Sequence, residues 1–426
     1  MRILVVGGGG REHAIVRALA RSAARPELLC TPGNPGIGAD ARTISAAGEG
    51  AEALVAAARQ ESVDLVIVGP EAPLVAGAVD ALEEAGIAAF GPSAAAARLE
   101  GSKVHAKQAM AEAGVPSAEH AVAGSRAEAL AHLDGCAYPV VLKADGLAAG
   151  KGVIIAAEER EGREAVEAFF TERRFGETSV LIEEHLEGEE LSLLALCDGA
   201  NVVPLSPAQD YKRIFDGDEG PNTGGMGSYS PVAGIDAALL DDIVERVHRP
   251  IVELMAARGT PFHGVLYAGL MLTAAGPKVL EFNCRFGDPE TQAVLPRLRS
   301  DLVELCRASR EPGGLAGVEA EFSPEWAVTL VLASGGYPES SSKGDVIHGV
   351  VEAMASGAEI THAGTAMRDG ELVTAGGRVL NVTSLGPDPD AARRRAYDAA
   401  DLIKFNGRQM RSDIALRAVE RLVARD

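Results

Sequence analysis

The sequence predicts an α/β protein in three parts: an N-terminal domain with a parallel sheet, a central α+β domain of two modules with a lid, and a C-terminal mixed α/β domain. The chain has 426 residues, more than one hydrophobic core usually organises. Up to about residue 101, short apolar runs alternate with apolar residues at helical spacing, as in parallel sheets covered by helices. From Ser102 onward this alternation gives way to consecutive strand-like runs and glycine-rich loops.

The first part, residues 1–101, opens with an apolar run at 2–6 that is typical of a strand buried on both faces. Apolar residues at helical spacing follow it at Ala14, Ile15, Ala18 and Leu19. The same reasoning predicts strands at 28–30, 63–68 and 87–90 and helices at 51–59 and 76–85.

The glycine loop at 7–13, Gly-Gly-Gly-Gly-Arg-Glu-His, joins the first strand to the first helix. Backbone N–H groups and a helix N-terminus would meet there, which suits a phosphate. A dinucleotide cofactor is an alternative, but the third glycine of that motif is missing and no acidic residue ends the second strand. A glycine turn that serves only tight packing is the other alternative.

The second part, residues 102–318, has a lid at about 121–189. The predicted helices and strands of this part are a helix at 102–113, strands at 138–143, 153–156, 180–184 and 191–196, a helix at 163–170, a helix at 238–258, strands at 265–272 and 278–283, and a helix at 290–308. Residues 207–231 are rich in Gly, Pro, Asn and Asp with little periodicity, which at this length predicts a functional loop.

The third part, residues 319–426, follows glycines and prolines at 312–324 that suggest a boundary. Strands are expected there at 327–333, 346–351, 361–365 and 378–384.

Composition narrows the class of function. There are 40 Lys and Arg against 61 Asp and Glu, and this net charge of −21 argues against binding along a nucleic-acid backbone. The five cysteines form no CxxC pair, so neither a disulfide framework nor a zinc site is predicted, and reduced thiols in a cytoplasm fit best. No apolar stretch reaches 18 residues, so we expect neither a signal peptide nor a membrane partner.

Lys143 ends an apolar strand and is followed by a glycine-rich loop at 144–152. A lysine fixed beside such a loop can reach a polyphosphate while the loop amides close over it. Within the loop, Lys151 has an alternative interpretation as an ordinary surface lysine. At the exit of a later strand, Glu183, Leu186 and Glu190 could surround an adenosine, although glutamates at strand ends are usually only solvated.

The strongest metal signal is Glu281-Phe282-Asn283. On a strand, residues i and i+2 face the same side, so a carboxylate and an amide oxygen project together. Such hard oxygen ligands suit Mg²⁺. Arg285 follows two residues later and can clamp a carboxylate or a phosphoryl group. A charged surface strand is the alternative.

Together these stretches resemble the ATP-grasp superfamily and, within it, the phosphoribosylamine glycine ligase family. The resemblance rests on motifs in the family's order over about the first 300 residues: 7–13, Gly-Pro-Glu-Ala-Pro-Leu at 69–74, Lys-Ala-Asp-Gly-Leu-Ala-Ala-Gly-Lys-Gly-Val at 143–153, Ala-Gln-Asp-Tyr-Lys-Arg at 208–213, Gly-Pro-Asn-Thr-Gly-Gly-Met-Gly at 220–227 and Glu-Phe-Asn-Cys-Arg-Phe-Gly-Asp-Pro-Glu-Thr at 281–291. It implies a Rossmann-like pre-ATP-grasp domain, an ATP-grasp domain with a lid, and a closing domain.

The resemblance also implies a reaction in purine biosynthesis, in which ATP, glycine and 5-phosphoribosylamine give glycinamide ribonucleotide, ADP and phosphate through glycyl phosphate. It implies Lys143, Arg285 and Asp210 as catalytic residues. The residues that it implies for ATP are Lys103, Lys143, Gly150, Lys151, Gly152, Glu183, Leu186 and Glu190. Those for the substrates are Gly10, Arg11, Glu12, Asn34, Pro70, Glu71, Asn222, Thr223, Gly224, Gly225, Met226 and Arg285. Glu281 and Asn283 would bind Mg²⁺ or Mn²⁺.

The sequence departs from the wider superfamily at one point. Many members carry a second acidic metal ligand on the strand before Glu281, and residues 265–272 contain none. Three alternatives stay open: another ATP-grasp ligase or carboxylase of nucleotide metabolism, a dehydrogenase, and a nucleotide-binding protein without catalysis. The last two are disfavoured, by the broken glycine motif and by the presence of the lysine, metal pair and arginine together.

Overall fold

The computed structural model describes residues 1–46, 48, 50–147 and 152–423. Its N-terminal part is a five-stranded parallel sheet in the order β3-β2-β1-β4-β5. The strands are β1 (Arg2–Gly7), β2 (Glu27–Pro32), β3 (Arg42–Thr43), β4 (Leu65–Val68) and β5 (Ala89–Phe90), and the helices are α1 (Gly10–Ala20), α2 (Ile37–Asp40), α3 (Gly50–Gln60), α4 (Glu71–Val75), α5 (Ala78–Glu84) and α6 (Ala94–Gly101). The parallel sheet expected from the alternating pattern is confirmed.

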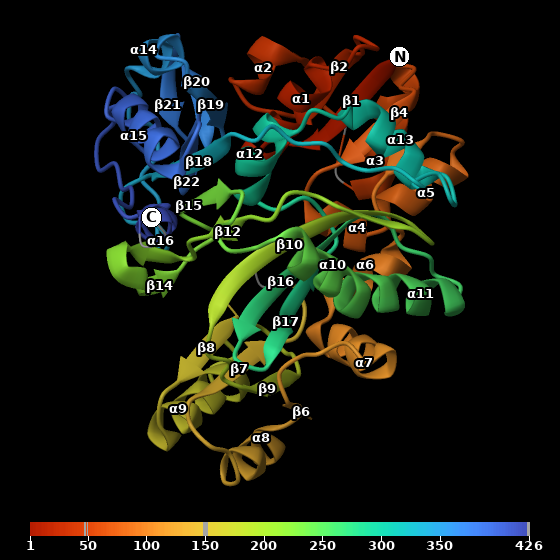
Figure 1. Cartoon of the computed structure of the whole chain (residues 1–426), viewed down its shortest axis with the longest axis vertical. Coiled ribbons are helices and arrows are strands. Elements are labelled where there is room, and N and C mark those ends of the chain that lie inside the picture. Colours follow the sequence, from red (N-terminus) through yellow and green to blue (C-terminus); the bar gives the residue numbers. More distant parts are fainter. Residues whose placement is uncertain (47, 49, 148–151, 424–426) are drawn as a thin grey trace.

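The lid module is a separate four-stranded antiparallel sheet in the order β6-β9-β7-β8. It consists of β6 (His120–Ala123), β7 (Val140–Ala144), β8 (Val153–Ala156) and β9 (Val180–Glu184), with α8 (Arg126–Leu133) and α9 (Glu159–Phe170). Side chains of both helices pack with those of the sheet in one small core that includes Leu133, Phe169 and Ile182. In Figure 1 this module forms the lower end of the molecule, beyond α7 (Lys103–Ala113).

The central sheet is antiparallel in the order β11-β10-β16-β17. Its strands are β10 (Glu189–Asp198), β11 (Val202–Pro204), β16 (His263–Thr273) and β17 (Gly276–Asn283). The helix predicted at 238–258 is α10 (Ala237–Ile243) and α11 (Arg249–Ala257) with a π-helical turn at Val244–His248 between them. Pro250 has no N–H group to donate to the preceding turn, which is a physical reason for the irregularity.

The C-terminal sheet is antiparallel in the order β12-β15-β18-β22-β19. Its strands are β12 (Gln209–Asp210), β15 (Gly227–Ser230), β18 (Trp326–Ala333), β19 (Glu359–His362) and β22 (Arg378–Gly386). The remaining elements are the hairpins β13 (Arg213–Phe215) with β14 (Glu219–Asn222) and β20 (Thr365–Arg368) with β21 (Glu371–Thr374), and the helices α12 (Glu290–Val294), α13 (Leu302–Arg310), α14 (Val350–Ala355), α15 (Pro389–Ala400) and α16 (Leu416–Val423). In Figure 1 the C-terminal and N-terminal parts lie side by side at the upper end.

Three local predictions were wrong. Residues 207–231 are not a loop throughout, because β12 and β15 pair with each other and β15 pairs with β18. The helix predicted at 290–308 is broken: Pro296 cannot continue the hydrogen bonding, and Asp301 caps a new helix by accepting from Val303 N at 2.9 Å. The strand predicted at 346–351 runs into α14, which begins after Gly349 at φ +83°.

The predicted domain limits of 1–101, 102–318 and 319–426 stay predictions, although β12 and β15 share a sheet with the C-terminal strands. Within the described residues, no helix is long and apolar enough to cross a membrane.

Candidate active site

Lys143 lies at the end of β7 and belongs to a buried ion-pair triad. Its Nζ is 2.8 Å from Glu183 Oε2, and Lys107 Nζ is 3.3 Å from the other oxygen of the same carboxylate. Lys143 Nζ also donates to Leu280 O on β17 at 3.2 Å, which joins the lid sheet to the central sheet. Glu183 therefore holds two lysine ammonium groups at the junction of the two sheets.

Glu281 and Asn283 lie at the end of β17, next to Leu280, whose carbonyl accepts from Lys143. Burial raises the pKa of Glu281, but four nearby cations outweigh it, so the pKa lies below its ordinary value. These cations are Lys212, Lys143, Lys103 and Arg285. The carboxylate is therefore ionised and surrounded by positive charge, as a ligand for a metal bound to phosphates should be.

Arg285, which follows β17, connects the end of this strand to the N-terminal domain. Its guanidinium is 3.2 Å from Glu71 Oε2 and 3.0 Å from Glu100 Oε1, and it donates to Asn283 Oδ1 at 3.3 Å. Burial lowers its pKa, but Glu100 and Glu71 outweigh this and raise the pKa above its ordinary value. Arg11 Nη1 also approaches Glu71, at 3.8 Å, so Glu71 lies between two arginines.

The glycine loop at 7–13 is closed by its own carboxylate. Glu12 Oε2 accepts from Gly9 N at 2.7 Å, and Glu12 Oε1 accepts from Arg11 Nε at 2.5 Å. A Cβ at Gly10 would be only 2.1 Å from Asn381 Nδ2, so β22 of the C-terminal sheet approaches this loop directly.

Asn34 and the turn at 70–71 flank the same loop. Asn34 Nδ2 donates to Gly8 O at 3.0 Å and to His362 O at 2.8 Å, while Asn34 Oδ1 accepts from Ile37 N at 2.9 Å. Pro70 caps α4 and Glu71 is its first residue. The side chain of Asn34 thus ties the glycine loop to β19 and α2. Glu71 is the charged residue of the turn at 70–71.

The loop at 222–226 is held by the backbone next to Lys212. Thr223 Oγ1 donates to Lys212 O at 2.8 Å and accepts from Gly225 N at 2.9 Å. Asn222 ends β14, and Gly224 N donates to Tyr337 OH at 3.0 Å. Gly225 has φ +105°, and a Cβ there would be 2.4 Å from Pro289 Cδ, so glycine is required. The side chain of Met226 is fully buried, its N–H donates to Tyr211 O at 2.7 Å and its O accepts from Val331 N at 3.0 Å, so this residue is fixed against the C-terminal sheet.

Asp210 lies in a cluster of charges with Lys212. Burial raises the pKa of Asp210 above its ordinary value; Lys212 opposes the shift, and Glu290, Glu190 and Glu281 add to it. Lys212 Nζ forms an ion pair with Glu190. Glu281 affects the pKa of both Asp210 and Lys212, which are two residues apart, so the end of β17 and the segment at 210–212 belong to one charge cluster.

The residues predicted around ATP differ in burial and in whether they contact the glycine-rich loop. Lys103 Nζ donates to Ala144 O at 3.1 Å and to Gly146 O at 2.8 Å, at the base of the glycine-rich loop. Gly152 closes that loop by accepting from Ala144 N at 2.8 Å. Leu186 is buried just after β9, and Glu190 is the second residue of β10, with 39% of its side chain exposed. Gly150 and Lys151 lie outside the described residues.

Several residues of this site were missed from the sequence. They are Glu100, Lys107, Ser192, Lys212, Tyr267, Asp288, Glu290 and Arg378. Two of them had a signal: Lys107 is one helical turn after Lys103, and Lys212 stands two residues after Asp210. Arg378 has no such signal, since its ion pair with Asp288 at 3.1 Å comes from a distant strand.

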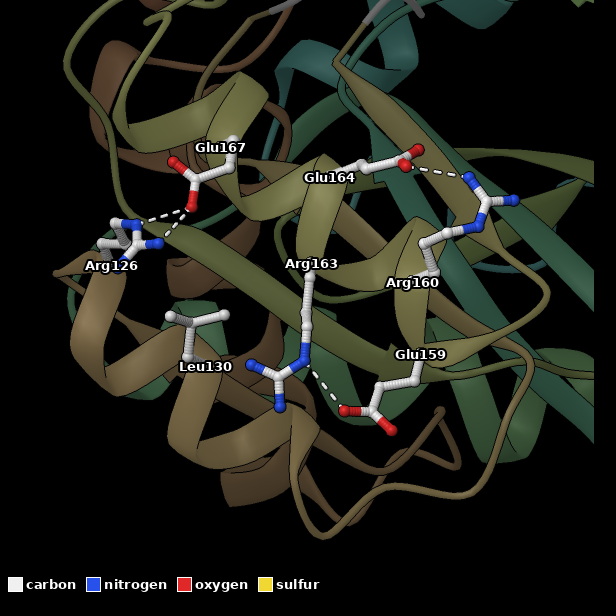
Figure 2. Close-up of a pocket in the computed structure, with 7 residues that line it drawn as sticks. All are labelled: Arg126, Leu130, Glu159, Arg160, Arg163, Glu164 and Glu167. Carbon is white, nitrogen blue, oxygen red and sulfur yellow. Dashed lines mark hydrogen bonds and ion pairs between the residues drawn. The ribbon is translucent and has the colours of Figure 1, made fainter.

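A cavity on the outer face of the lid lies away from this site. Figure 2 shows it between α8 and α9, where Arg126, Arg160 and Arg163 are each paired with a glutamate. Since none of the predicted site residues lines it, this cavity is a surface groove of paired charges.

Comparison with known proteins accounts for this arrangement over nearly the whole chain. Residues 1–100 match the phosphoribosylglycinamide synthetase N domain, residues 101–291 its ATP-grasp (A) domain, and residues 327–417 its C domain. The chain belongs to the phosphoribosylglycinamide synthetase family. Proteins with the ATP-grasp domain of this family use ATP, which agrees with the lysines and carboxylates gathered around β17.

Full-length relatives carry the same family name. The chain is 45% identical over 426 residues to a phosphoribosylamine–glycine ligase of Vibrio vulnificus, with 99% of each chain covered. It is 50% identical over 429 residues to one of Leifsonia xyli, covering 98% of this chain and 100% of the other. A crystal structure of a phosphoribosylamine–glycine ligase from Thermotoga maritima matches with a TM-score of 0.85 and 35% identity, covering 97% and 100% of the two chains.

More distant structures show the fold alone. The biotin carboxylase domain of a Hydrogenobacter thermophilus 2-oxoglutarate carboxylase has a TM-score of 0.70 at 17% identity, covering 96% of this chain and 91% of that domain. The synthetase family therefore shares its three-part architecture with proteins of different chemistry, and the specific site residues carry the functional argument.

Proposed function

We propose that this chain ligates glycine to 5-phosphoribosylamine at the expense of ATP, through glycyl phosphate, in purine biosynthesis. The products are glycinamide ribonucleotide, ADP and phosphate. The observation that carries the proposal is the convergence of Lys143, Arg285 and the Glu281–Asn283 pair at one place, between the lid sheet and the N-terminal domain. Full-length identity with phosphoribosylamine–glycine ligases supports the same reaction.

The chemistry explains why cations gather here. A carboxylate resists nucleophiles because of its charge, and oxide is a very poor leaving group. When a carboxylate oxygen of glycine attacks the γ-phosphorus, ADP leaves and the acyl group gains phosphate as a leaving group. The amine of phosphoribosylamine then attacks the acyl carbon, an amide bond forms, and phosphate and a proton are released. Lys143, Lys103 and Arg285 would offset the negative charge that moves during the transfer.

Glu281 and Asn283 fit a divalent cation, Mg²⁺ or Mn²⁺. Their oxygens are hard ligands on one face of β17, and a cation that keeps several waters needs only one or two such ligands from the protein. Bound there, it would neutralise charge on the phosphates. Arg285 donates to Asn283 Oδ1, so the cation would use the second lone pair of this amide oxygen.

The remaining residues divide between the substrates in this proposal. Lys103, Gly152, Glu183, Leu186 and Glu190 serve ATP, with Glu183 acting through the lysines that it holds. Phosphoribosylamine lies along the glycine loop of the N-terminal domain, where Arg11 and Glu71 carry the charges. The loop at 222–226 and Asp210 face glycine and the γ-phosphate. The five free cysteines are consistent with a cytoplasmic location.

A phosphate-release assay tests the function. We expect phosphate from ATP only when glycine and phosphoribosylamine are both present, and Glu281→Gln to lower kcat by roughly 1,000-fold while the chain stays folded. Equal rates with another acid or amine would assign the chain to a different ATP-grasp ligase. Wild-type rates in the variant would overturn the metal assignment.

A further inference from the structure

Glu290, the first residue of α12, is a buried carboxylate with one unused oxygen. Its side chain is 3% exposed, and its Oε1 accepts from Tyr267 OH at 2.7 Å and from Ser192 Oγ at 3.4 Å. The two hydroxyls are 2.8 Å apart, so they fix the carboxylate together. The other oxygen, Oε2, is buried and has no hydrogen-bond donor among the described residues.

An unpaired buried carboxylate oxygen is costly, because burial removes water without replacing its hydrogen bonds. The other buried carboxylates nearby have basic partners: Glu183 has two lysines and Glu12 has Arg11. Glu290 has no Lys, Arg or His within ion-pair distance in the described part of the chain. Its free oxygen therefore lacks the positive charge that a cationic group of a substrate would supply.

The pairing of the strands places this oxygen at the reaction site. Tyr267 lies opposite Asn283, and two residues along β16, Gly269 lies opposite Glu281. Ser192 lies opposite Gly269 on the other neighbour, β10. Because alternate residues of a strand share a face, the hydroxyls that hold Glu290 and the proposed metal pair are on the same side of the sheet.

Two further features concern the surroundings of the free oxygen. A Cβ at Gly287 would be 2.4 Å from Glu290 Oε2, so any side chain there would cover this oxygen. Asp210 supplies a second carboxylate nearby, as the effect of Glu290 on its pKa indicates. Arg285, five residues before Glu290, offers the opposite charge.

We propose that Glu290 binds the α-ammonium group of the amino acid substrate through Oε2, with Tyr267 and Ser192 as positioning residues. This inference rests on the proposed function and names the group that selects glycine as an amino acid. Glycine has opposite charges one carbon apart, which suits a pocket with Arg285 on one side and Glu290 on the other. A divalent cation fits less well, because Oε1 already accepts two hydroxyls and no group of three metal-ligating side chains occurs among the described residues.

The test compares kinetic constants in Glu290→Gln, which keeps the shape of the side chain and removes its charge. We expect KM for glycine to rise by roughly 100-fold, while KM for ATP and for phosphoribosylamine changes by less than about threefold. Glycolate carries a hydroxyl in place of the ammonium group, so the preference for glycine over glycolate should fall by a similar factor. Calorimetric titration of glycine into the protein with a non-hydrolysable ATP analogue should show the same loss of affinity.

Two more variants keep the result interpretable. Tyr267→Phe leaves the charge of Glu290 but removes one positioning bond, and it should raise KM for glycine by about tenfold. Asp198→Asn is the matched control: Asp198 is another fully buried carboxylate, and it accepts from Ala200 N, Asn201 N and Leu315 N, outside the site. It should leave KM for glycine unchanged. If Glu290→Gln fails to fold, the KM for glycine of Tyr267→Phe tests the assignment, and an unchanged value would overturn it.

The outcomes separate this inference from the function. If the wild-type chain releases no phosphate with glycine and phosphoribosylamine, the proposed function fails. If it does, an unchanged KM for glycine in Glu290→Gln, or an increase confined to phosphoribosylamine, overturns the assignment of Glu290 alone.

Discussion

Removing the carboxylate of Glu183 should destabilise the protein strongly, because two buried lysines depend on it. Glu183 is 3% exposed, Lys107 is 2% exposed and Lys143 is 8% exposed, so water screens these charges little. Breaking a buried ion pair by deleting one partner costs about 3–5 kcal/mol, since the remaining charge stays buried. We therefore expect Glu183→Gln to lower the free energy of unfolding by about this amount and, in a chain of this length, the melting temperature by roughly 3–6 °C.

Urea and thermal unfolding of four proteins would measure this effect. Lys107→Met alone should cost less than Glu183→Gln, because the carboxylate keeps Lys143 at 2.8 Å. The double variant carries both Glu183→Gln and Lys107→Met, so it leaves one uncompensated cation fewer than Glu183→Gln alone. Its loss of unfolding free energy should therefore be smaller than the sum of the two single losses by at least about 1 kcal/mol. Additive costs, or a loss below about 1 kcal/mol in Glu183→Gln, would refute the argument that this carboxylate holds both lysines.

Two further predictions concern other parts of the chain. Burial lowers the pKa of His248 from 6.5 to about 4, so protonation favours the unfolded chain. The free energy of unfolding should therefore fall as pH drops from about 6.5 to 4, by up to about 1.4 kcal/mol per pH unit. Urea titrations should show a flatter slope in His248→Gln. Arg411 is 1% exposed and pairs with Asp218 at 2.9 Å and with Asp413 at 2.6 Å. Arg411→Met should therefore lower the free energy of unfolding by about 3 kcal/mol, whereas replacing the exposed Arg417 by Met should lower it by less than about 1 kcal/mol. Equal losses in the two variants would contradict the argument from burial.

The parts of the fold that sequence could predict are those governed by local rules. The apolar run at 2–6 forms β1, and the strands expected at 180–184 and 278–283 are β9 and the end of β17, because apolar periodicity reflects burial directly. The errors have local causes of a different kind. Pro296 broke a helix whose apolar pattern continues through it, and Gly349 at φ +83° started a helix where an apolar run suggested a strand.

The residues of the candidate site also fall into those that local rules predict and those that depend on how distant strands pair. Glu281 and Asn283 could be proposed from sequence because a strand fixes the relation between residues i and i+2. Glu290 was visible in the same motif, but its function depends on Tyr267 and Ser192. Those hydroxyls reach it only because β10, β16 and β17 pair in one particular register, and no local pattern specifies a register between strands 75 residues apart.

The C-terminal part has a larger share in the site than its weak motifs suggest. Asp210 lies on β12, which pairs with β15 in the C-terminal sheet, and Arg378 of β22 pairs with Asp288, five residues after the end of β17. Arg411 holds the β13–β14 hairpin, whose two ends carry Lys212 and Asn222. The loop that would face glycine is thus fixed from the C-terminal side, while Arg285 is fixed from the N-terminal side through Glu71. An enzyme that must bring three substrates together needs such opposed supports, because a shift of about 1 Å between reacting groups is enough to slow the reaction greatly.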